Sequence, residues 1–503
     1  MTAAAKNLGD LRFKESSQLE ADVLIIGSGA GGATVATTMA ESGLSVLVLE
    51  EGPYVPASQA PARMADSLAK LWRCGGLTVA YGSPHVAYAE GRCVGGSTEI
   101  NSAIFQRTPD ALLAEWALHY RIRDFSADNL APHYDWAAQA VNASPTPKPL
   151  GPPSDIIARA GNLMGWQIKE LERGQRSCVG TNLCSYSCPT GGKQSMTNSL
   201  LPRAVAAGAR VISEVKVRRI IMKDRRAVGV EAVARGADGQ THRIVVRGRK
   251  VFICAGAIQT PALLRGAGLK KAVGRSLRIH PTIKCLALFD ETIDAQDHRF
   301  PQYAITQFMP NWRMGGSVFT PATFGLALAE DWPRRRGHLS KIRHAAIYYV
   351  MARGQGRGRI WSMPRNAAPL VTYKLDGRDW NGLSNGAAQL GQALLRAGAR
   401  CVLPSIAGHQ GWQTEEAAKA EIGEPLPHGR SQLMSIHLSG SCPIGENEDA
   451  CAANSFGRVH GTENLYLADA SAIPEAPGVN PQATAMAISR RNALHSLEEK
   501  SGT

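Results

Sequence analysis

The pattern of hydrophobic and polar residues is clearest near the start of this chain. Residues 22–26 are apolar after Asp22, small residues follow the turn GSGAGG up to about Ser42, and residues 45–50 form a second apolar run. We therefore predict a strand, a helix ended by Gly43, and a second strand. This order, with a glycine-rich turn behind the first strand, is typical of a nucleotide-binding βαβ unit.

Later segments alternate between helical and β patterns. Residues 109–140 have a helical pattern and residues 209–254 have the apolar runs of several strands. After the last of these runs, Thr260 and Pro261 predict the N-cap and first residue of a helix. The other expectations are a surface excursion over 52–90, a proline-rich linker over 142–155, a helix over about 387–397 and a final helix over about 481–496.

Composition bounds the class of protein. The chain has 503 residues, 44% of them hydrophobic and 19% charged, which is typical of a folded protein with two or three domains. Its formal net charge is +14, which favours anionic surfaces or an acidic partner and leaves open a peripheral contact with membranes. The basic residues are scattered and are not interleaved with aromatics, so we expect no nucleic-acid binding.

No targeting signal is visible in the sequence. The first residues, MTAAAKNLGDLRFKESS, lack the apolar core of a secretory signal. No run of about 18 apolar residues indicates a transmembrane helix. Ten cysteines without an export signal suggest thiols in a reducing compartment. We therefore expect a cytoplasmic protein.

The first glycine turn has the chemistry of a dinucleotide site. Gly27 would allow the tight turn, Gly29 would let backbone approach a pyrophosphate, and Gly32 would pack helix on strand. Glu50, at the end of the second strand, is placed to accept a hydrogen bond from a ribose hydroxyl. The motif alone does not separate FAD from NAD.

A second glycine-rich segment, GRCVGGSTEIN, covers residues 91–101. Gly95 and Gly96 would let backbone pass close to a flat ring or a phosphate, and Asn101 offers a hydrogen-bonding side chain at its end. The alternative is a plain surface loop.

The candidate acid–base chemistry lies near the carboxyl end. His437 opens HLSGSCPIG, and Asn480 lies in GVNPQATAM just before the final predicted helix. A neutral imidazole suits removal of a hydroxyl proton while hydride leaves carbon. Both residues also have a structural alternative, since histidines are often structural and Asn480 is suited to cap the helix.

With these segments in view, the chain resembles the glucose–methanol–choline (GMC) oxidoreductases over nearly its full length, in particular bacterial fatty-alcohol-oxidase-like and choline-dehydrogenase-like members. The segments that carry the resemblance are DVLIIGSGAGG, GRCVGGSTEIN, FICAGAIQTPALL, GRSLRIHP, HLSGSCPIG and GRVHGTENLYLADASAIPEAPGVNPQATAM. The resemblance implies FAD as the cofactor, His437 as the catalytic base and Asn480 as its partner. It also implies cofactor contacts at Val215, Asp469 and Pro481.

The implied fold is α/β: a Rossmann-like FAD-binding domain and a second, substrate-binding α+β domain of antiparallel sheet and helices. The FAD-binding domain is expected at 18–108, 203–290 and 430–503, and the substrate-binding domain at 109–202 and 291–429. Glu99, Leu438 and the pair Pro443-Ile444 depart from the residues usual in the family, which bears on substrate fit more than on chemistry.

Cys178, Cys184 and Cys188 have five and then three residues between them. This spacing is similar to that of fatty-alcohol-oxidising members, and also to that of sugar-dehydrogenase relatives in which three such cysteines hold a [3Fe–4S] cluster. We expect structural thiols or a lost cluster here, and hence no metal.

The resemblance favours oxidation of an alcohol, primary and aliphatic or aromatic, to an aldehyde or ketone. It does not choose among oxygen, a quinone and a cytochrome as electron acceptor. Two alternatives stay open at this level: a hydroxynitrile-lyase-type relative that keeps FAD without redox turnover, and a flavin-binding electron carrier without catalysis.

Overall fold

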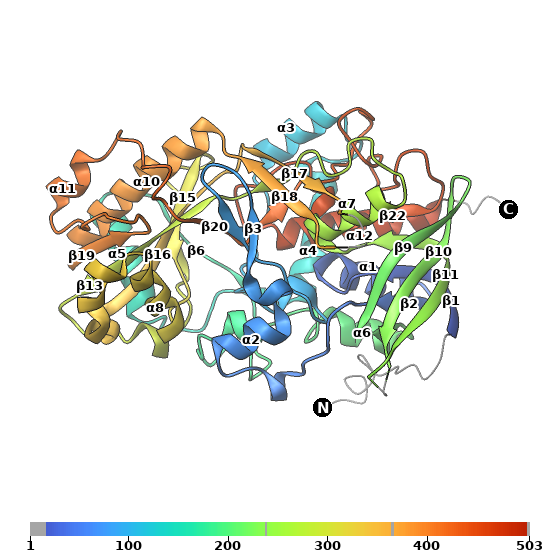
Figure 1. The fold of residues 1–503 in the computed structure, drawn as a ribbon, viewed down its shortest axis with the longest axis horizontal. Coiled ribbons are helices and arrows are strands. Elements are labelled where there is room, and N and C mark those ends of the chain that lie inside the picture. The colour runs from blue at the N-terminus through green and yellow to red at the C-terminus, as the bar shows by residue number, and fades with distance from the viewer. Residues whose placement is uncertain (1–16, 237–238, 364–366, 500–503) are drawn as a thin grey trace.

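Two large sheets lie toward opposite ends of an elongated molecule (Figure 1). The computed structural model describes residues 17–236, 239–363 and 367–499. The segment at residues 1–17, where we expected no secretory signal, lies outside the described residues, apart from its last residue, Ser17.

The first sheet has seven strands and contains the predicted βαβ unit. β1, β2, β8, β11 and β22 run parallel, whereas β9 and β10 continue β11 as an antiparallel meander. The strands are β1 (Ser17–Ile26), β2 (Val46–Leu49), β8 (Arg210–Ile212), β9 (Val215–Lys223), β10 (Arg226–Arg235), β11 (Thr241–Ile253) and β22 (Leu465–Leu467). β2 is buried along its whole length, as expected of a parallel strand covered on both faces.

The helices that cover this sheet come from distant parts of the chain. The central one, α1, packs against the last helix and a short one, and the last helix packs in turn on α4. They are α1 (Ala30–Glu41), α4 (Ala127–Ala140), α6 (Leu200–Ala206) and α12 (Gln482–Glu498). Gly43 follows α1 with a φ of +83°, so it ends the predicted helix as expected.

The second sheet has nine strands and is mostly antiparallel, with β4 and β20 as a parallel pair. It is formed by β3 (Thr78–Ala80), β4 (Val86–Tyr88), β20 (Leu433–Ser435), β13 (Thr282–Phe289), β16 (Ala345–Ala352), β15 (Trp312–Gly316), β14 (Tyr303–Ile305), β6 (Ile168–Glu170) and β19 (Ala399–Pro404). The long helix α10 (Gly377–Arg396) packs across it. An α/β fold with one mixed and one largely antiparallel sheet matches the predicted class.

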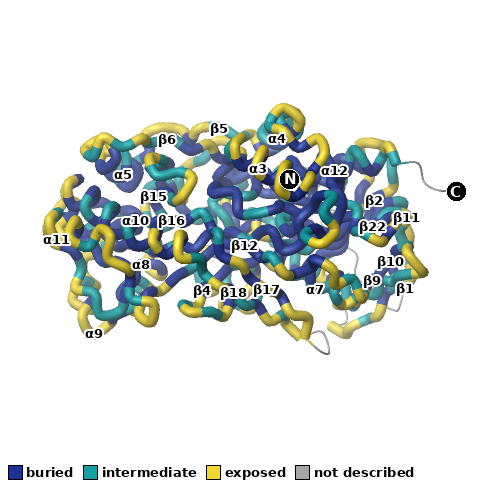
Figure 2. Tube along the Cα trace, turned by 90° about the horizontal axis from the view of Figure 1, so that it is seen from above, coloured by how far each residue is buried: buried dark blue, intermediate teal, exposed yellow. Residues whose placement is uncertain are grey.

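Smaller elements complete the described chain. The strands, which pair in twos, are β5 (Ala143–Ser144) with β7 (Arg173–Gly174), β12 (Arg278–Ile279) with β21 (Leu438–Ser439), and β17 (Arg357–Trp361) with β18 (Leu370–Lys374). The helices are α2 (Met64–Leu71), α3 (Asp110–Tyr120), α5 (Pro152–Leu163), α7 (Gly256–Gly266), α8 (Pro321–Ala329), α9 (Trp332–Arg335) and α11 (Glu415–Ala420). The 3-10 turns are Ala57–Gln59, Arg73–Gly76, Gly96–Thr98, Cys184–Tyr186, Ala295–Asp297, Arg336–His344 and Ala470–Ala472. Buried segments run through the middle of the molecule around β12 and α12 (Figure 2).

The predicted start of α7 at Thr260 is wrong. The helix begins at Gly256, whose N–H donates to the Asp469 carboxylate at 2.8 Å, so a residue from another segment satisfies the helix end. Pro261 lies inside the helix and has no N–H to donate to Ala257 O. The hydroxyl of Ser441 donates to Ala257 O at 2.6 Å instead, so this buried carbonyl still has a hydrogen-bond donor.

Three other expectations were too short or too simple. α10 begins ten residues before the predicted start. Gly382 and Gly386 lower the helix propensity of its first half, so the sequence pattern missed this part. Both glycines lie against the Trp312 ring, which a Cβ would meet at 3.2 Å from Gly382 and 3.0 Å from Gly386. Residues 52–90 are not only a surface excursion, since β3 and β4 add two strands to the second sheet. The segment 142–155 likewise leads into α5 at Pro152.

The predicted domain ranges stay a prediction, and packing crosses them. β3, β4, β13 and β20 lie in ranges expected for the FAD-binding domain but belong to the nine-stranded sheet. Conversely, apolar residues of α3 and α4 share one core with the first sheet. The chain therefore passes between the two layers several times, which brings distant segments to one site.

Candidate active site

The glycines behind β1 have two different roles. A Cβ on Gly27 would lie 2.3 Å from Cys254 O, and one on Gly32 would lie 2.0 Å from Gly27 O. These two residues are glycines because backbone packs against backbone. A Cβ on Gly29 would meet only the Cα of Gly96, at 3.9 Å, so Gly29 faces open space. That space lies at the amino end of α1.

This space is suited to an anion. Gly29 precedes α1, no side chain caps the helix, and its first turn contains no acidic residue, so its backbone N–H groups and positive dipole end stay available. The second glycine-rich loop lies across it. Gly95 N donates to Ser28 Oγ at 3.0 Å, and a Cβ on Gly96 would lie 2.9 Å from Gly29 Cα. Two glycine loops thus meet where a pyrophosphate would pass.

Glu50 follows β2 and is 7% exposed. Its carboxylate accepts from Ser28 N at 3.0 Å, Ser28 Oγ at 2.7 Å and Gly52 N at 2.9 Å. Burial raises the pKa of this carboxyl, although these hydrogen bonds oppose the shift. A carboxylate offers about four acceptor positions. One remains for a ribose hydroxyl, so the residues around this loop fit the dinucleotide part of FAD.

The other predicted cofactor residues surround the same region. Asn101 donates to Gln482 Oε1 at 2.7 Å and so ties the second glycine loop to the start of α12. Pro481 directly precedes that helix. Val215 begins β9, and its N–H donates to Glu50 O at 2.8 Å. Asp469 differs, because its carboxylate is engaged at the start of α7 by Gly256 N and Thr260 Oγ1. Direct contact of these residues with the cofactor stays a prediction.

His437 and Asn480 lie side by side. Asn480 Nδ2 is 3.0 Å from His437 Nε2, although 43 positions separate the two residues. Asn480 is not a side-chain cap of α12, since no side chain caps that helix. Its amide is instead directed to the histidine by the tertiary structure. The alternative role considered for Asn480, capping of the final helix, is therefore wrong.

His280 and Arg313 complete this cluster. His280 Nδ1 lies 2.9 Å from His437 Nδ1, and Gly478 N donates to His280 Nε2 at 3.0 Å. Arg313 donates to Asn480 Oδ1 at 2.6 Å and to the side-chain oxygen of Gln106. The side chains of His280 and Arg313 are each 1% exposed. No described carboxylate pairs with Arg313, so the cluster contains an uncompensated buried cation.

The hydrogen-bond donors of this cluster constrain its protons. Arg313 has only donors, so Asn480 must present its oxygen to Arg313 and its NH₂ to His437 Nε2. Gly478 N–H donates to the far nitrogen of His280. Two neutral imidazoles carry two protons, and one of them occupies the Nδ1–H···Nδ1 bond between the rings. The second must therefore lie on an Nε2 that already faces a donor. At one end of the histidine pair, an Nε2–H therefore faces another hydrogen-bond donor, a mismatch that an added acceptor would relieve.

Both histidines are held neutral. Burial, and then the charge of Arg313, lowers the pKa of His437 to about 3. Burial, followed by the effects of His437, Arg313 and Arg353, lowers the pKa of His280 well below its usual value. Neutral rings near pH 7 are the forms that accept a proton.

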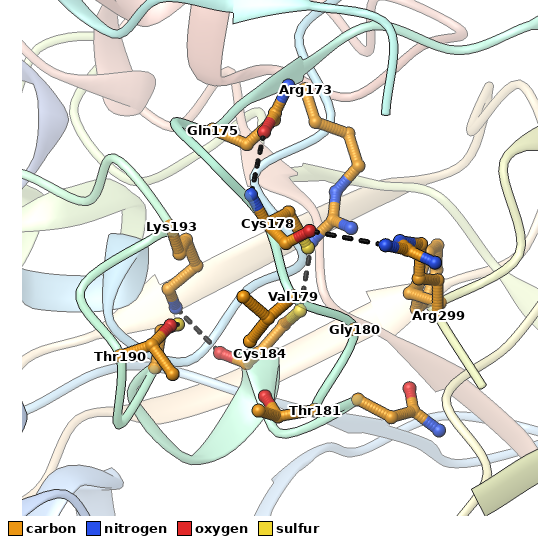
Figure 3. Close-up of a pocket in the computed structure, with 13 residues that line it drawn as sticks. Arg173, Gln175, Cys178, Val179, Gly180, Thr181, Cys184, Thr190, Lys193 and Arg299 are labelled. Atoms are coloured by element: carbon orange, nitrogen blue, oxygen red, sulfur yellow. Dashed lines mark hydrogen bonds between the residues drawn. The ribbon is translucent and has the colours of Figure 1, made fainter. Parts of the chain in front are cut away.

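Cys178, Cys184 and Cys188 line a small cavity with Arg173, Lys193 and Arg299 (Figure 3). Arg173 donates to Cys184 Sγ at 2.9 Å. Burial acts to raise the pKa of the Cys188 thiol, but hydrogen bonds from Thr190 and the backbone of Lys193 lower it overall. The cavity of about 10 Å³ has room for about one water molecule. Among the described residues, no three His, Cys, Asp or Glu side chains are grouped to hold a metal ion. This arrangement does not fit a [3Fe–4S] cluster, and the predicted absence of metal stays a prediction.

The cysteine segment instead braces the second glycine loop. Lys193 Nζ donates to Glu99 O at 2.6 Å, Asn101 O at 3.1 Å and Cys184 O at 2.6 Å. The Glu99 carboxylate accepts from Thr197 Oγ1 at 2.8 Å. The carboxylate that departs from the family pattern is thus bound to the segment following the cysteines.

Sequence reasoning missed His280, Arg313 and Gln106. His280 lies in GRSLRIHP, one of the segments that carried the resemblance, and its place in that segment was the available signal. Arg313 and Gln106 lie outside those segments, and nothing in their local sequence marks them. Only the sheet, in which β13 and β16 bring β15 close to His280, places Arg313 beside Asn480.

Comparisons with known proteins agree with this geometry. Family models described as "GMC oxidoreductase" match residues 68–282 and 355–489, and one described as "FAD binding domain" matches residues 22–69. An uncharacterized GMC-type oxidoreductase of Sinorhizobium fredii is 50% identical over 98% of each chain. The long-chain-alcohol oxidase FAO1 of Arabidopsis thaliana is 26% identical over 96% of this chain and 68% of its own.

The fold is also found in a solved structure. The crystal structure of pyridoxine 4-oxidase from Mesorbium loti superimposes with a TM-score of 0.70 at 17% identity, and covers 95% of this chain and 99% of that one. At this identity the likeness concerns the fold alone. Together with the family models and the relative at 50% identity, it leads to one conclusion: the chain belongs to the GMC oxidoreductase family and is an FAD-dependent oxidoreductase.

Proposed function

We propose that this protein oxidises an alcohol, primary and aliphatic or aromatic, to the corresponding carbonyl compound, with His437 as the base. The observation that carries the proposal is the convergence of His437 Nε2 and Asn480 Nδ2, 3.0 Å apart. An alcohol oxygen placed against both side chains would accept a hydrogen bond from Asn480 and transfer its proton to His437. FAD, when bound, supplies the acceptor for the hydride that leaves carbon.

The proposal requires one tautomer of the histidine pair, in which the two donors that face each other are His280 Nε2–H and Gly478 N–H. When His437 Nδ1–H donates to His280 Nδ1, His437 Nε2 keeps its lone pair and can accept the hydroxyl proton. After proton transfer, His437 Nε2–H and Asn480 Nδ2–H are both donors toward the same oxygen. A carbonyl oxygen has two lone pairs and accepts from both, so it relieves the mismatch at that end. The pair of side chains thus complements the alcohol before proton transfer and the carbonyl product after it.

Arg313 has two effects in this proposal. It fixes the Asn480 amide so that NH₂ faces the substrate oxygen. Its buried charge also favours negative charge developing on that oxygen as the proton leaves. The same charge keeps His437 neutral before reaction.

The choice of an aliphatic alcohol is supported by similarity to the long-chain-alcohol oxidases of Arabidopsis thaliana. The rival function is a hydroxynitrile-lyase-type reaction, in which FAD is kept without redox turnover. Anaerobic mixing with a series of primary alcohols separates the two. Bleaching of the oxidised flavin absorbance supports the proposal, whereas cyanohydrin cleavage with unchanged flavin absorbance contradicts it.

A further inference from the structure

Five short strands form a continuous sheet face that is open to solvent. β17 pairs with β18, Tyr81 bridges to Thr372 of β18, β3 pairs with β4, and β4 pairs with β20. Because paired residues point to the same face and alternate residues do likewise, the register defines which side chains share the outer face. In Figure 2, β4, β18 and β17 lie side by side along one edge of the molecule.

Six apolar side chains are exposed on this outer face. We call it the apolar face and define it by its exposed residues: Leu77 (87% exposed), Val79 (36%), Tyr81 (53%), Trp361 (41%), Leu370 (38%) and Ile436 (51%). The solvent side of an antiparallel sheet is ordinarily polar, with apolar residues alternating inward. A contiguous exposed apolar surface in a folded protein marks an interaction site.

The charged residues of these five strands are all basic. None of the five strands contains Asp or Glu. Arg357, Arg359 and Lys374 are exposed on the same face of β17 and β18, two to four residues along the strands from the Trp361–Leu370 pair, and no described carboxylate pairs with them. The net charge of +14 has the same sign. An anionic partner with an apolar interior complements this surface.

The apolar face leads to the candidate active site. Ile436 points outward, whereas the next residue, His437, points inward and is 9% exposed. Met434, two residues before Ile436, stands opposite Ala87 in the register of β20 and β4. Ile436 of the outer surface and the base His437 are therefore consecutive residues, in the short link between β20 and β21.

We propose that the apolar face docks on the surface of a membrane containing anionic lipids and that the alcohol substrate is taken from that membrane. The second part rests on the proposed function and narrows the substrate to apolar alcohols that partition into lipid. Tyr and Trp suit the interface between headgroups and acyl chains, while arginine and lysine side chains reach the anionic headgroups. A second copy of the chain fits less well, since two molecules of charge +14 would repel each other.

No helix among the described residues is long and apolar enough to cross a bilayer. The proposed contact is a reversible one that depends on both apolar and charged residues. Each cation near an anionic surface contributes about a fivefold gain in binding, so loss of two gives about 25-fold weaker binding, and salt reduces this share further.

The test is flotation of FAD-loaded protein with phosphatidylcholine vesicles, with and without phosphatidylserine, at low and high salt. We expect binding only with phosphatidylserine, weakened by salt. The double variant Leu77→Glu/Leu370→Glu should bind at least about tenfold more weakly, since both side chains lose apolar burial. Arg357→Gln/Arg359→Gln should bind about 25-fold more weakly. Leu118→Glu changes an exposed leucine on α3, outside this face, and should bind like wild type.

Three outcomes would overturn the membrane proposal. The first is no vesicle binding by wild type, and the second is an equal loss of vesicle binding in Leu118→Glu. The third is a dimer in solution that Leu77→Glu/Leu370→Glu dissociates, with no binding to vesicles. Flavin reduction by a short water-miscible alcohol is measured on the same samples and should be unchanged in all variants. Vesicle binding without reduction by any alcohol would support the docking face and contradict the proposed function. Reduction without vesicle binding would do the reverse.

Discussion

The glycine loop at the start of α1 and the histidine site at the start of α12 both lie at helix amino ends, but they are built differently. Gly27, Gly29 and Gly32 lie within one turn of chain and work through backbone. The histidine site works through side chains, and its residues come from five separate segments: Gln106, His280, Arg313, His437 and Asn480. A backbone site can be built locally, whereas a site of buried titratable side chains needs neighbours that restrain their protons.

The two regions also differ in their electrostatics. At the glycine loop, a buried carboxylate, Glu50, is held by three donors and its pKa is raised by burial. At the histidine site, burial and a buried cation lower the pKa of both rings. Substitutions in the first region should therefore change cofactor retention, and substitutions in the second should change proton transfer with the cofactor in place.

The largest expected effect is loss of FAD from Gly29→Val. A Cβ at Gly29 meets only Gly96 Cα at 3.9 Å, so the chain should fold while the added methyl groups fill the pyrophosphate space. FAD content after purification and circular dichroism of the apoprotein measure the two effects. Gly32→Val is the matched control and should fail to fold, because its Cβ would lie 2.0 Å from Gly27 O. A yellow, FAD-loaded Gly29→Val protein would show that the cofactor passes elsewhere.

His437→Ala should retain FAD but slow its anaerobic reduction by about 10²–10⁴-fold, the range for loss of a general base. Stopped-flow absorbance with a substrate alcohol measures the rate between about pH 6 and 9, which spans the usual titration of histidine. A wild-type rate in this variant would assign the base to another residue. Loss of FAD from the variant would favour a structural role for His437.

Asn480→Ala should have a smaller effect on the rate, and its effect should not add to that of His437→Ala, because both residues act on one oxygen. We also expect a loss of about 1–3 kcal/mol in the free energy of unfolding, because Arg313 loses a buried acceptor. Arg313→Met tests this reason. In that background, Asn480→Ala should cost far less, whereas an unchanged cost would contradict the proposed pairing.

His280→Asn should slow flavin reduction by up to about 10²-fold, since it disturbs the tautomer and orientation of the base rather than removing it. The structural readout is nitrogen NMR of ¹⁵N-histidine-labelled protein. In wild type, the proton shared between the two Nδ1 atoms should give a downfield proton signal bound to labelled nitrogen. This signal should disappear in His280→Asn. An unchanged spectrum and pH profile would reduce His280 to a packing role.

A further effect concerns the stability of the protein as a function of pH. His280 and His437 have lowered pKa values in the folded protein. Below about pH 6.5, the unfolded chain therefore binds protons at these histidines that the folded chain does not bind. Their contribution to the free energy of unfolding is therefore complete above about pH 6.5 and falls toward pH 3, by at most about 1.4 kcal/mol per pH unit for each ring. Buried acids with raised pKa, such as Glu50, give the opposite slope.

Urea unfolding of wild type and His280→Asn between about pH 7.5 and 4.5 isolates the histidine share, because the acids are common to both proteins. The variant should lose less stability on acidification. Parallel curves would mean that His280 titrates alike in the folded and unfolded states.

Much of the fold could be predicted because its signals are local. The βαβ unit followed from two apolar runs, a glycine turn and Gly43, and α12 followed from the residues after Asn480. The errors occurred where a distant residue supplied what the local sequence lacked. Asp469 allowed α7 to begin four residues before Thr260, and Trp312 packed against glycines that made the first half of α10 look unlike a helix.

The sequence by itself determined the family, the cofactor and the two residues that lead the proposed chemistry, because glycine spacing and short motifs are read along the chain. The tertiary structure alone decided the surroundings of those residues. It brought His280 to His437 and Arg313 to Asn480, and it joined Leu77, Leu370 and Ile436 into one face. The physical reason is that burial, proton sharing and surface continuity depend on distances between segments that lie far apart in the chain.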